Sequence, residues 1–169
     1  MTEARVEGIF VGSAAAGPLD AVRKVRAEQG RGLVGDRYWS GQGTFWKPLS
    51  DREVTLIEME SLEALAAEAS ISLQPGEARR NIATRGVRLN DLVNRRFRVG
   101  DATLLGIRLC EPCGHLERLT GQTLRPALNG RGGLRAAVLV DGAISVGDGI
   151  ETSGELETAE SMPAVQTAD

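Results

Sequence analysis

Residues 136–146 have the sequence Ala-Ala-Val-Leu-Val-Asp-Gly-Ala-Ile-Ser-Val, in which an Asp-Gly pair separates two short apolar runs. Valine and isoleucine favour strands, and Asp-Gly between apolar runs is the strongest short-range signal of a β-hairpin. The sequence therefore predicts two strands, 136–140 and 143–146, joined by a tight turn at Asp141-Gly142.

Several other short segments have the composition of strands. Their bounds are Arg5–Val11, Ala21–Arg26, Glu53–Ile57, Arg79–Thr84, Arg96–Val99 and Ala102–Leu109. Segment 96–99 alternates cleanly, whereas segment 21–26 has a pattern that would also suit a helix. Seven or eight short strands at close spacing predict a mainly β fold, a closed or nearly closed β-barrel with one or two short helices.

Two segments are candidates for those helices, and a third is predicted to be a loop. Residues 58–69 place Met59, Leu62, Leu65, Ala66 and Ala69 on one helical face. Residues 114–121 fit a short helix or a loop. Residues 30–46 hold five glycines and several aromatic residues, which is typical of a long ordered loop that carries function.

The length of 169 residues favours a single domain. We place that domain at residues 1–151. Residues 152–169 are acidic, contain no Lys or Arg, and have few large apolar side chains. We expect them to form a disordered acidic tail, because they cannot bury enough surface to offset their chain entropy.

Composition and charge exclude several classes of protein. The chain has 20 Lys and Arg against 23 Asp and Glu and no basic run, so we expect no nucleic-acid binding. No apolar run approaches the roughly 20 residues that a membrane-spanning helix needs, and the first residues do not resemble a secretory signal. Two cysteines three residues apart form no disulfide framework, so we expect a cytoplasmic protein.

Two stretches hold candidate anion-binding residues next to glycines. Asp36 and Arg37 follow Gly35, where they would place an acceptor and a planar donor at the tip of a loop, or form only a solvated ion pair. Arg79-Arg80-Asn81 follows a Pro-Gly turn. On a strand, adjacent arginines point to opposite faces, so one can face a pocket, and the Asn81 amide adds donors and an acceptor. The alternative is a charged strand at the edge of a sheet.

A third stretch contains Arg131-Gly132-Gly133-Leu134-Arg135. Its glycines and arginines could form a backbone nest for an anion, although the spacing is not that of a phosphate-binding loop. Arg131 and Arg135 are therefore second choices for binding an anionic ligand.

The fourth stretch contains Cys110-Glu111-Pro112-Cys113-Gly114-His115. A zinc site would need further ligands, and His115 is the only histidine in the chain. A thioredoxin-like redox pair would need a different strand and helix context. The remaining interpretation separates the cysteines: Cys110 ends an apolar strand as a core residue, whereas Cys113 lies beyond it in a Pro-Cys-Gly turn, where its thiolate is accessible. His115 could act as a proton donor beside it, or be an ordinary surface histidine.

Taken together and in this order, these stretches resemble the MOSC family, the domain named after the C-terminal part of molybdenum cofactor sulfurases. The resemblance covers about residues 5–150 and suggests a short, stand-alone bacterial-type member. The segments that carry it are 8–12, 32–37, 54–58, 75–82, 86–92, 97–100, Glu111-Pro112-Cys113, 131–136 and 144–148.

The resemblance implies a β-rich, barrel-like fold with one hallmark cysteine, which by position is Cys113. In several members this cysteine is a ligand of molybdenum in the pterin cofactor, and some of those members reduce N-hydroxylated compounds. We therefore expect Cys113 as catalytic residue and metal ligand, His115 as second catalytic residue, and a cofactor held by residues Asp36, Arg37, Arg79, Arg80, Asn81, Arg131 and Arg135. The chain has no room for the pyridoxal-phosphate domain of the sulfurases, so we expect no pyridoxal phosphate here.

Three functions remain open at this point. The first is a molybdenum-cofactor enzyme that reduces N- or S-oxygenated small molecules with an electron-donor protein. The second is a sulfur carrier or transferase that works through a Cys113 persulfide, with a cysteine desulfurase or another sulfur donor as partner. The third is a non-catalytic module that binds or delivers the cofactor. Fold resemblance alone does not choose between them.

Overall fold

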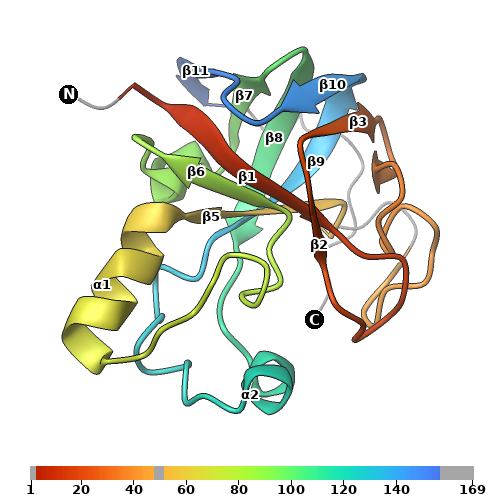
Figure 1. Ribbon diagram of the computed structural model, residues 1–169. Coiled ribbons are helices and arrows are strands. Elements are labelled where there is room, and N and C mark those ends of the chain that lie inside the picture. The colour runs from red at the N-terminus through yellow and green to blue at the C-terminus, as the bar shows by residue number, and fades with distance from the viewer. Residues whose placement is uncertain (1–2, 48–51, 157–169) are drawn as a thin grey trace.

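The computed structural model describes residues 3–47 and 52–156, and this part of the chain is mainly β (Figure 1). The helical elements are α1 (Met59–Ala69), the 3₁₀ turn η1 (Leu89–Leu92) and α2 (Gly114–Thr120). The strands are β1 (Arg5–Val11), β2 (Asp20–Val22), β3 (Lys24–Glu28), β4 (Gly32–Leu33), β5 (Val54–Glu58), β6 (Ile82–Arg85), β7 (Arg95–Val99), β8 (Ala102–Leu109), β9 (Leu134–Val140), β10 (Gly142–Ser145) and β11 (Ile150–Leu156). No helix of the described residues is long and apolar enough to cross a membrane.

The strands form two sheets. The larger has the order β11-β7-β8-β9-β5-β6-β1-β2, and the smaller has the order β10-β3-β4. All pairs are antiparallel except β5 with β6. The sheets are not closed into a barrel, so a closed β-barrel is not confirmed. Strand β1 lies beside the segment that leads into β11, where the Val6 amide donates to the Asp148 carbonyl oxygen at 2.9 Å and the Ile150 amide donates to the Ala4 carbonyl oxygen at 3.0 Å.

The predicted hairpin at Asp141-Gly142 is wrong. Strand β9 pairs with β5 and β8, whereas β10 pairs with β3 of the other sheet. The Asp141 carboxylate accepts a hydrogen bond from the Gln29 amide at 2.6 Å, which ties the corner to the end of β3. A side chain at Gly142 would overlap the backbone of Asp101. Asp-Gly therefore marks the place where the chain passes between sheets, and not a two-residue turn.

Other predicted elements are confirmed or revised. Strand β1, helix α1 and the alternating strand β7 are confirmed. Segment 21–26 contains parts of two strands, β2 and β3. The predicted strand 79–84 begins only at Ile82, because Arg79 has a positive φ of 60°. Strand β11 continues five residues past the predicted domain boundary at Glu151, and residues 157–169 of the predicted tail lie outside the described residues.

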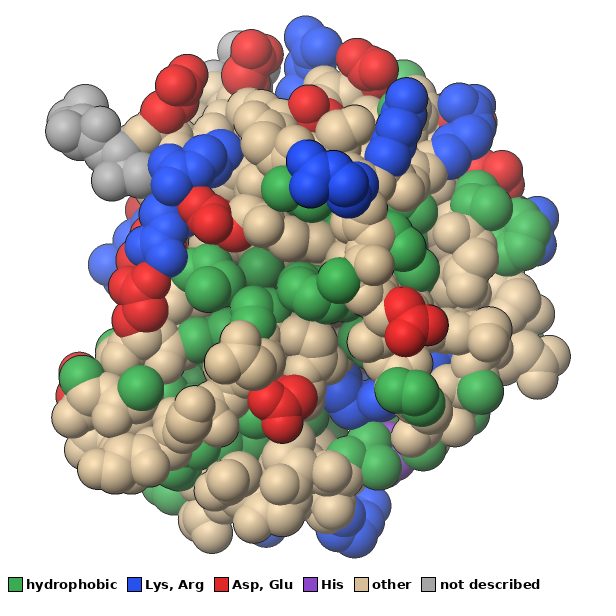
Figure 2. Space-filling view, viewed as in Figure 1, with side chains coloured by type: hydrophobic (Ala, Val, Ile, Leu, Met, Phe, Trp, Pro, Cys, Tyr) green, Lys and Arg blue, Asp and Glu red, His purple; other side chains and the backbone are tan. Residues whose placement is uncertain are grey.

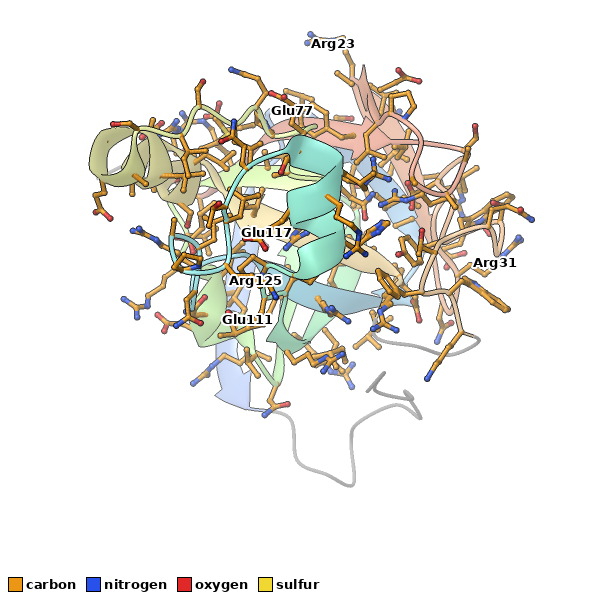
Figure 3. The ribbon with its side chains drawn as sticks, turned by 90° about the horizontal axis from the view of Figure 1, so that it is seen from below. Arg23, Arg31, Glu77, Glu111, Glu117 and Arg125 are labelled. Carbon is orange, nitrogen blue, oxygen red and sulfur yellow. The ribbon has the colours of Figure 1, made fainter. Side chains whose placement is uncertain are left out.

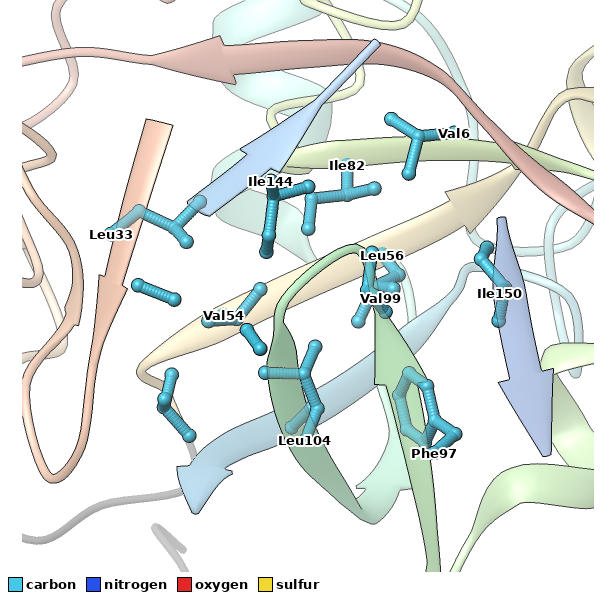
Figure 4. Close-up of a cluster of buried hydrophobic side chains, with 14 of the residues drawn as sticks. Val6, Leu33, Val54, Leu56, Ile82, Phe97, Val99, Leu104, Ile144 and Ile150 are labelled. Carbon is cyan, nitrogen blue, oxygen red and sulfur yellow. The ribbon is translucent and has the colours of Figure 1, made fainter. Parts of the chain in front are cut away.

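The main core lies between the two sheets, where the inward-facing side chains of most strands meet (Figure 4). Its fully buried members include Leu56, Phe97 and Leu104. These strands alternate buried and exposed positions, as Phe97 and Val99 do against Arg96 and Arg98 on β7. Burying such side chains is the main favourable contribution to folding.

A second core joins the helices to the sheet. It contains Ile57, Leu62, Leu65, Leu73, Ala78, Ala83, Leu116, Leu124 and Leu128. Figure 1 shows α1 and α2 on the same side of the sheets, and Figure 2 shows hydrophobic side chains gathered across the middle of this face. Because α2 packs through Leu116, this second core fixes the end of the molecule that carries the two cysteines.

Candidate functional site

A pocket lies at this end, between the loop after β4, the turn before β6, β9 and the segment that joins β8 to α2. It brings together six of the nine residues predicted as a site. Its lining residues are Arg37, Tyr38, Thr44, Phe45, Arg52, Thr55, Arg79, Arg80, Cys110, Glu111, Cys113, His115, Leu116 and Arg135.

Helix α2 is held in place by the loop that follows it. The Glu117 carboxylate accepts hydrogen bonds from the Leu124 amide at 2.8 Å, the Arg125 amide at 3.1 Å and the Arg125 guanidinium at 2.7 Å. Figure 3 looks onto this end of the molecule, with α2 in front and Glu117 and Arg125 side by side. These hydrogen bonds therefore fix the position of α2, and Cys113 and His115 lie at the start of this helix.

The two cysteines differ in exposure. Cys110 is buried, and its amide donates to the Gly133 carbonyl oxygen at 2.7 Å. Cys113 is exposed and is the last residue before α2, with φ −137° and ψ 170°. Residues 110–113 form no turn, in contrast to the expected Pro-Cys-Gly turn: the chain runs on from β8 and then enters the helix. Cys113 is thus the thiol that a ligand in the pocket can reach.

Arginine side chains give the pocket a positive charge. Five guanidinium groups line it, those of Arg37, Arg52, Arg79, Arg80 and Arg135, whereas Glu111 is the only carboxylate among the lining residues. Arg37 is paired with the buried Asp36, with 2.9 Å between Nη1 and Oδ1. A set of cations in a partly enclosed pocket favours an anionic ligand.

Arg79 combines an uncommon backbone conformation with a partly occupied guanidinium group. Its positive φ of 60° is uncommon for a residue other than glycine. Its Nη1 donates to the Gly17 carbonyl oxygen at 2.6 Å, which leaves further donors of the guanidinium available. Burial lowers the pKa of Arg79, and the neighbouring Arg37 cation lowers it further. Both effects would be relieved by an anion in the pocket.

Arg80 uses its guanidinium differently. It is 7% exposed, and it donates to three carbonyl oxygens: Nε to Gly132 at 2.9 Å, Nη1 to Ala78 at 3.2 Å and Nη2 to Cys110 at 3.1 Å. Within residues 3–47 and 52–156 no ion pair to a carboxylate is found for it. Its charge therefore contributes to the pocket while three of its five N–H donors are occupied by the backbone.

Three predicted ligand-binding residues do not line the pocket. Asp36 is fully buried and accepts from the Gly12 amide at 3.2 Å, so it fixes the loop that carries Arg37. Asn81 accepts from the Thr55 amide at 3.1 Å and donates to the Phe10 carbonyl oxygen at 3.1 Å, which joins three strands. Arg131 pairs with Glu68 of α1 at 2.7 Å.

A family model of the MOSC domain matches residues 18–151. The chain belongs to the MOSC domain family. Comparison with curated proteins finds no match.

Solved structures with the same fold agree with this assignment. The YuaD protein from Bacillus subtilis has a TM-score of 0.71 at 19% identity, with 89% of this chain and 96% of that chain covered. YiiM from Escherichia coli has a TM-score of 0.68 at 17% identity, with 94% and 73% covered. YiiM from Geobacillus stearothermophilus has a TM-score of 0.66 at 17% identity, with 88% and 74% covered. At these identities the likeness concerns the fold.

The MOSC domain places its one histidine at the pocket wall. His115 contacts the Phe45 ring edge to face, with 5.4 Å between ring centroids. Burial lowers the pKa of His115, and the charges of Arg118, Arg79 and Arg37 lower it further. The imidazole is therefore mostly neutral at pH 7, with one ring nitrogen that donates and one that accepts.

Sequence patterns did not identify several lining residues of this MOSC domain. Tyr38, Thr44 and Phe45 come from the long glycine-rich loop, in which only Asp36 and Arg37 were chosen as candidate site residues. Arg52 carried no local signal, and Glu111 belonged to the Glu111-Pro112-Cys113 segment without being chosen as a site residue. Tyr38 is packed against Gly43, where a side chain would overlap its ring, so this glycine gives the loop its shape.

Proposed function

We propose that this MOSC domain binds the molybdenum cofactor in the pocket, with the Cys113 thiolate as a ligand of the metal, and that it reduces N- or S-oxygenated small molecules. The MOSC family is generally linked to molybdenum-cofactor binding. One observation carries the proposal for this chain: an exposed thiol and several arginines line the same pocket.

The residues present fit the chemistry of this cofactor. Thiolates are soft ligands of the kind that soft metal centres select. The phosphate of the pterin is a dianion that guanidinium groups recognise by paired hydrogen bonds. Arg79 has donors left after its bond to Gly17, and Arg37 and Arg135 line the same pocket. No group of three or more His, Cys, Asp or Glu side chains in the described residues could hold a metal by itself, so one cysteine with a cofactor-supplied ligand set is the arrangement that this site suits.

The chain's own side chains would then have separate tasks. When bound, the cofactor supplies two-electron redox chemistry at its metal. Cys113 would hold the metal, and Arg79, Arg37 and Arg135 would hold the phosphate end. His115, neutral at pH 7, would donate a hydrogen bond from its ring N–H to the oxygen of the substrate, and the protons that the reduction consumes would come from solvent. Phe45 shields one side of the imidazole from water. A reductase also needs electrons, for which we propose an electron-donor protein as partner.

A second candidate function rests on the exposure of the same thiol. Cys113 could carry a persulfide sulfur received from a cysteine desulfurase or another sulfur donor, because exposed thiolates are the ones that exchange sulfur. A module that only binds and delivers the cofactor would use the arginines and Cys113 without turnover.

Metal and pterin analysis of the native protein tests the proposal. We expect about one molybdenum and one pterin per chain in the wild type, loss of molybdenum in Cys113→Ser, and retention in the matched control Cys110→Ala, since a hydroxyl is a poor ligand for a soft metal. Turnover of a hydroxylamine with a chemical electron donor separates a reductase from a delivery module. Protein without molybdenum, whose Cys113 carries the added mass of one sulfur atom, would favour the persulfide function and exclude the first.

A further inference from the structure

Arg80 lies where three segments of the pocket wall meet. The turn before β6 carries Arg79, the segment after β8 carries Cys113, and the Gly132-Gly133 segment leads into β9 and Arg135. The guanidinium of Arg80 donates one hydrogen bond to each: to Ala78 in the first, Cys110 in the second and Gly132 in the third. A single side chain thus connects the backbones that present the thiol and two of the pocket arginines.

The backbone around Arg80 is built for this close approach. A side chain at Gly132 would overlap the Cys110 carbonyl oxygen, and a side chain at Gly133, whose φ is 116°, would overlap the Leu56 carbonyl oxygen. The Cys110 amide is bonded to the Gly133 carbonyl oxygen at 2.7 Å. The segment after β8 and the Gly132-Gly133 segment therefore lie in direct contact. The Arg80 guanidinium donates to the carbonyl oxygens of Cys110 and Gly132, one from each segment.

We propose that Arg80 is a positioning residue for Cys113, and not a residue that binds the ligand directly. Three of its five N–H donors are used by carbonyl oxygens that would otherwise be buried without partners, which is costly. Since Cys110 is three residues before Cys113 and the chain between them makes no turn, holding the Cys110 carbonyl holds the thiol near the cations of Arg37, Arg79 and Arg135. This assignment rests on the proposed role of Cys113, but its test does not need the cofactor.

The test compares two alkylating reagents on metal-free, full-length protein. Iodoacetamide is neutral and iodoacetate is an anion, and both react with the thiolate, so the ratio of their rates at Cys113 cancels the thiolate fraction and reports the local positive potential. The labelled cysteine is identified by mass spectrometry. Moving the thiol a few ångströms away from three guanidinium groups in a water-like dielectric lowers this ratio by about fourfold.

The informative variant is Arg80→Lys, because lysine keeps the positive charge but cannot reproduce the forked geometry. We expect the iodoacetate to iodoacetamide ratio to fall about fourfold in Arg80→Lys, and at least as far in Arg80→Met. The matched control is Val99→Ala, which weakens the core far from the pocket. It should leave the ratio unchanged even where its melting temperature equals that of Arg80→Lys.

Two results would overturn the assignment. One is a folded Arg80→Lys protein with the wild-type ratio; the other is an equal fall in Val99→Ala, which would show that general loosening is responsible. If neither Arg80 variant folds, Arg80→Gln, which keeps two donors, is measured in the same way. Absence of molybdenum from the wild-type protein would refute the proposed cofactor but would leave these labelling ratios and their interpretation intact.

Discussion

Glu53 is a buried carboxylic acid whose ionisation should set the pH dependence of stability. It lies just before β5, is 7% exposed, and accepts a hydrogen bond from the Val138 amide at 3.1 Å. Burial raises the pKa of Glu53 from 4.5 to about 7, although the Val138 amide opposes the rise. The folded protein therefore prefers the protonated acid more strongly than the unfolded chain does.

The sign and size of the effect follow from linkage. Because the folded pKa lies above the unfolded one, the stabilising contribution is fully present below pH 4.5 and is lost as the pH rises through about 7. The loss amounts to about 3 kcal/mol when Glu53 is fully ionised, which for a chain of this length corresponds to a fall of about 6–12 °C in melting temperature.

The variant Glu53→Gln tests this reasoning, since the amide oxygen can still accept the Val138 hydrogen bond but the side chain no longer titrates. Urea unfolding at pH 5, 7 and 9 should show that the variant gains stability relative to wild type as the pH rises, by up to about 3 kcal/mol at pH 9. The exposed Glu77→Gln is the control and should follow wild type throughout. A difference between wild type and Glu53→Gln that is the same at pH 5 and pH 9 would refute the reasoning.

Two further predictions concern the pocket and the C-terminal strand. Arg79→Met should lower the affinity of the metal-free protein for inorganic phosphate by about tenfold or more, because hydrogen bonds to charged groups contribute about 1.5–3 kcal/mol; Arg131→Met, outside the pocket, should bind like wild type in the same calorimetric titration, and equal losses in both would contradict a specific role for Arg79. Truncation after Glu151 should lower the melting temperature by several degrees, since Thr152 and Leu156 of β11 pair with β7. An unchanged melting temperature would mean that this pairing contributes little. The expectation that the tail is dispensable now applies only to residues 157–169.

The local residue pattern correctly predicted those elements whose buried face is specified by their own residues. The alternation in 96–99 and the apolar face of 58–69 each specify a buried side, and β7 and α1 bury those sides as expected. The same reasoning separated the two cysteines, because Cys110 continues the strand pattern of β8. The alternation of apolar and polar residues along a strand is a local property, so the buried face can be recognised without knowledge of the partner strand.

Pairing between elements could not be predicted in this way. The Asp-Gly pair is compatible both with a hairpin turn and with the corner between β9 and β10. The corner is stabilised by a hydrogen bond from the Gln29 amide to Asp141, and Gln29 is 112 residues away in the sequence. Whether the large sheet closes into a barrel likewise depends on which strands pair with one another, and the number of strands does not determine this. Arg52 and Glu111 line the pocket only because the fold brings their segments to it.

Arg79 and Arg80 show why a motif alone does not assign roles to its residues. On a regular strand they would point to opposite faces, and one would bind the ligand while the other met solvent. The positive φ of Arg79 breaks that alternation, so that both side chains line one pocket. Arg80 then finds three carbonyl oxygens, whereas Arg79 finds one and keeps donors for an anion. Since a guanidinium cannot give the same N–H both to a buried carbonyl and to a phosphate, this difference supports the two proposed roles: Arg80 as the residue that positions the wall carrying Cys113, and Arg79 as the residue that binds an anion in the pocket.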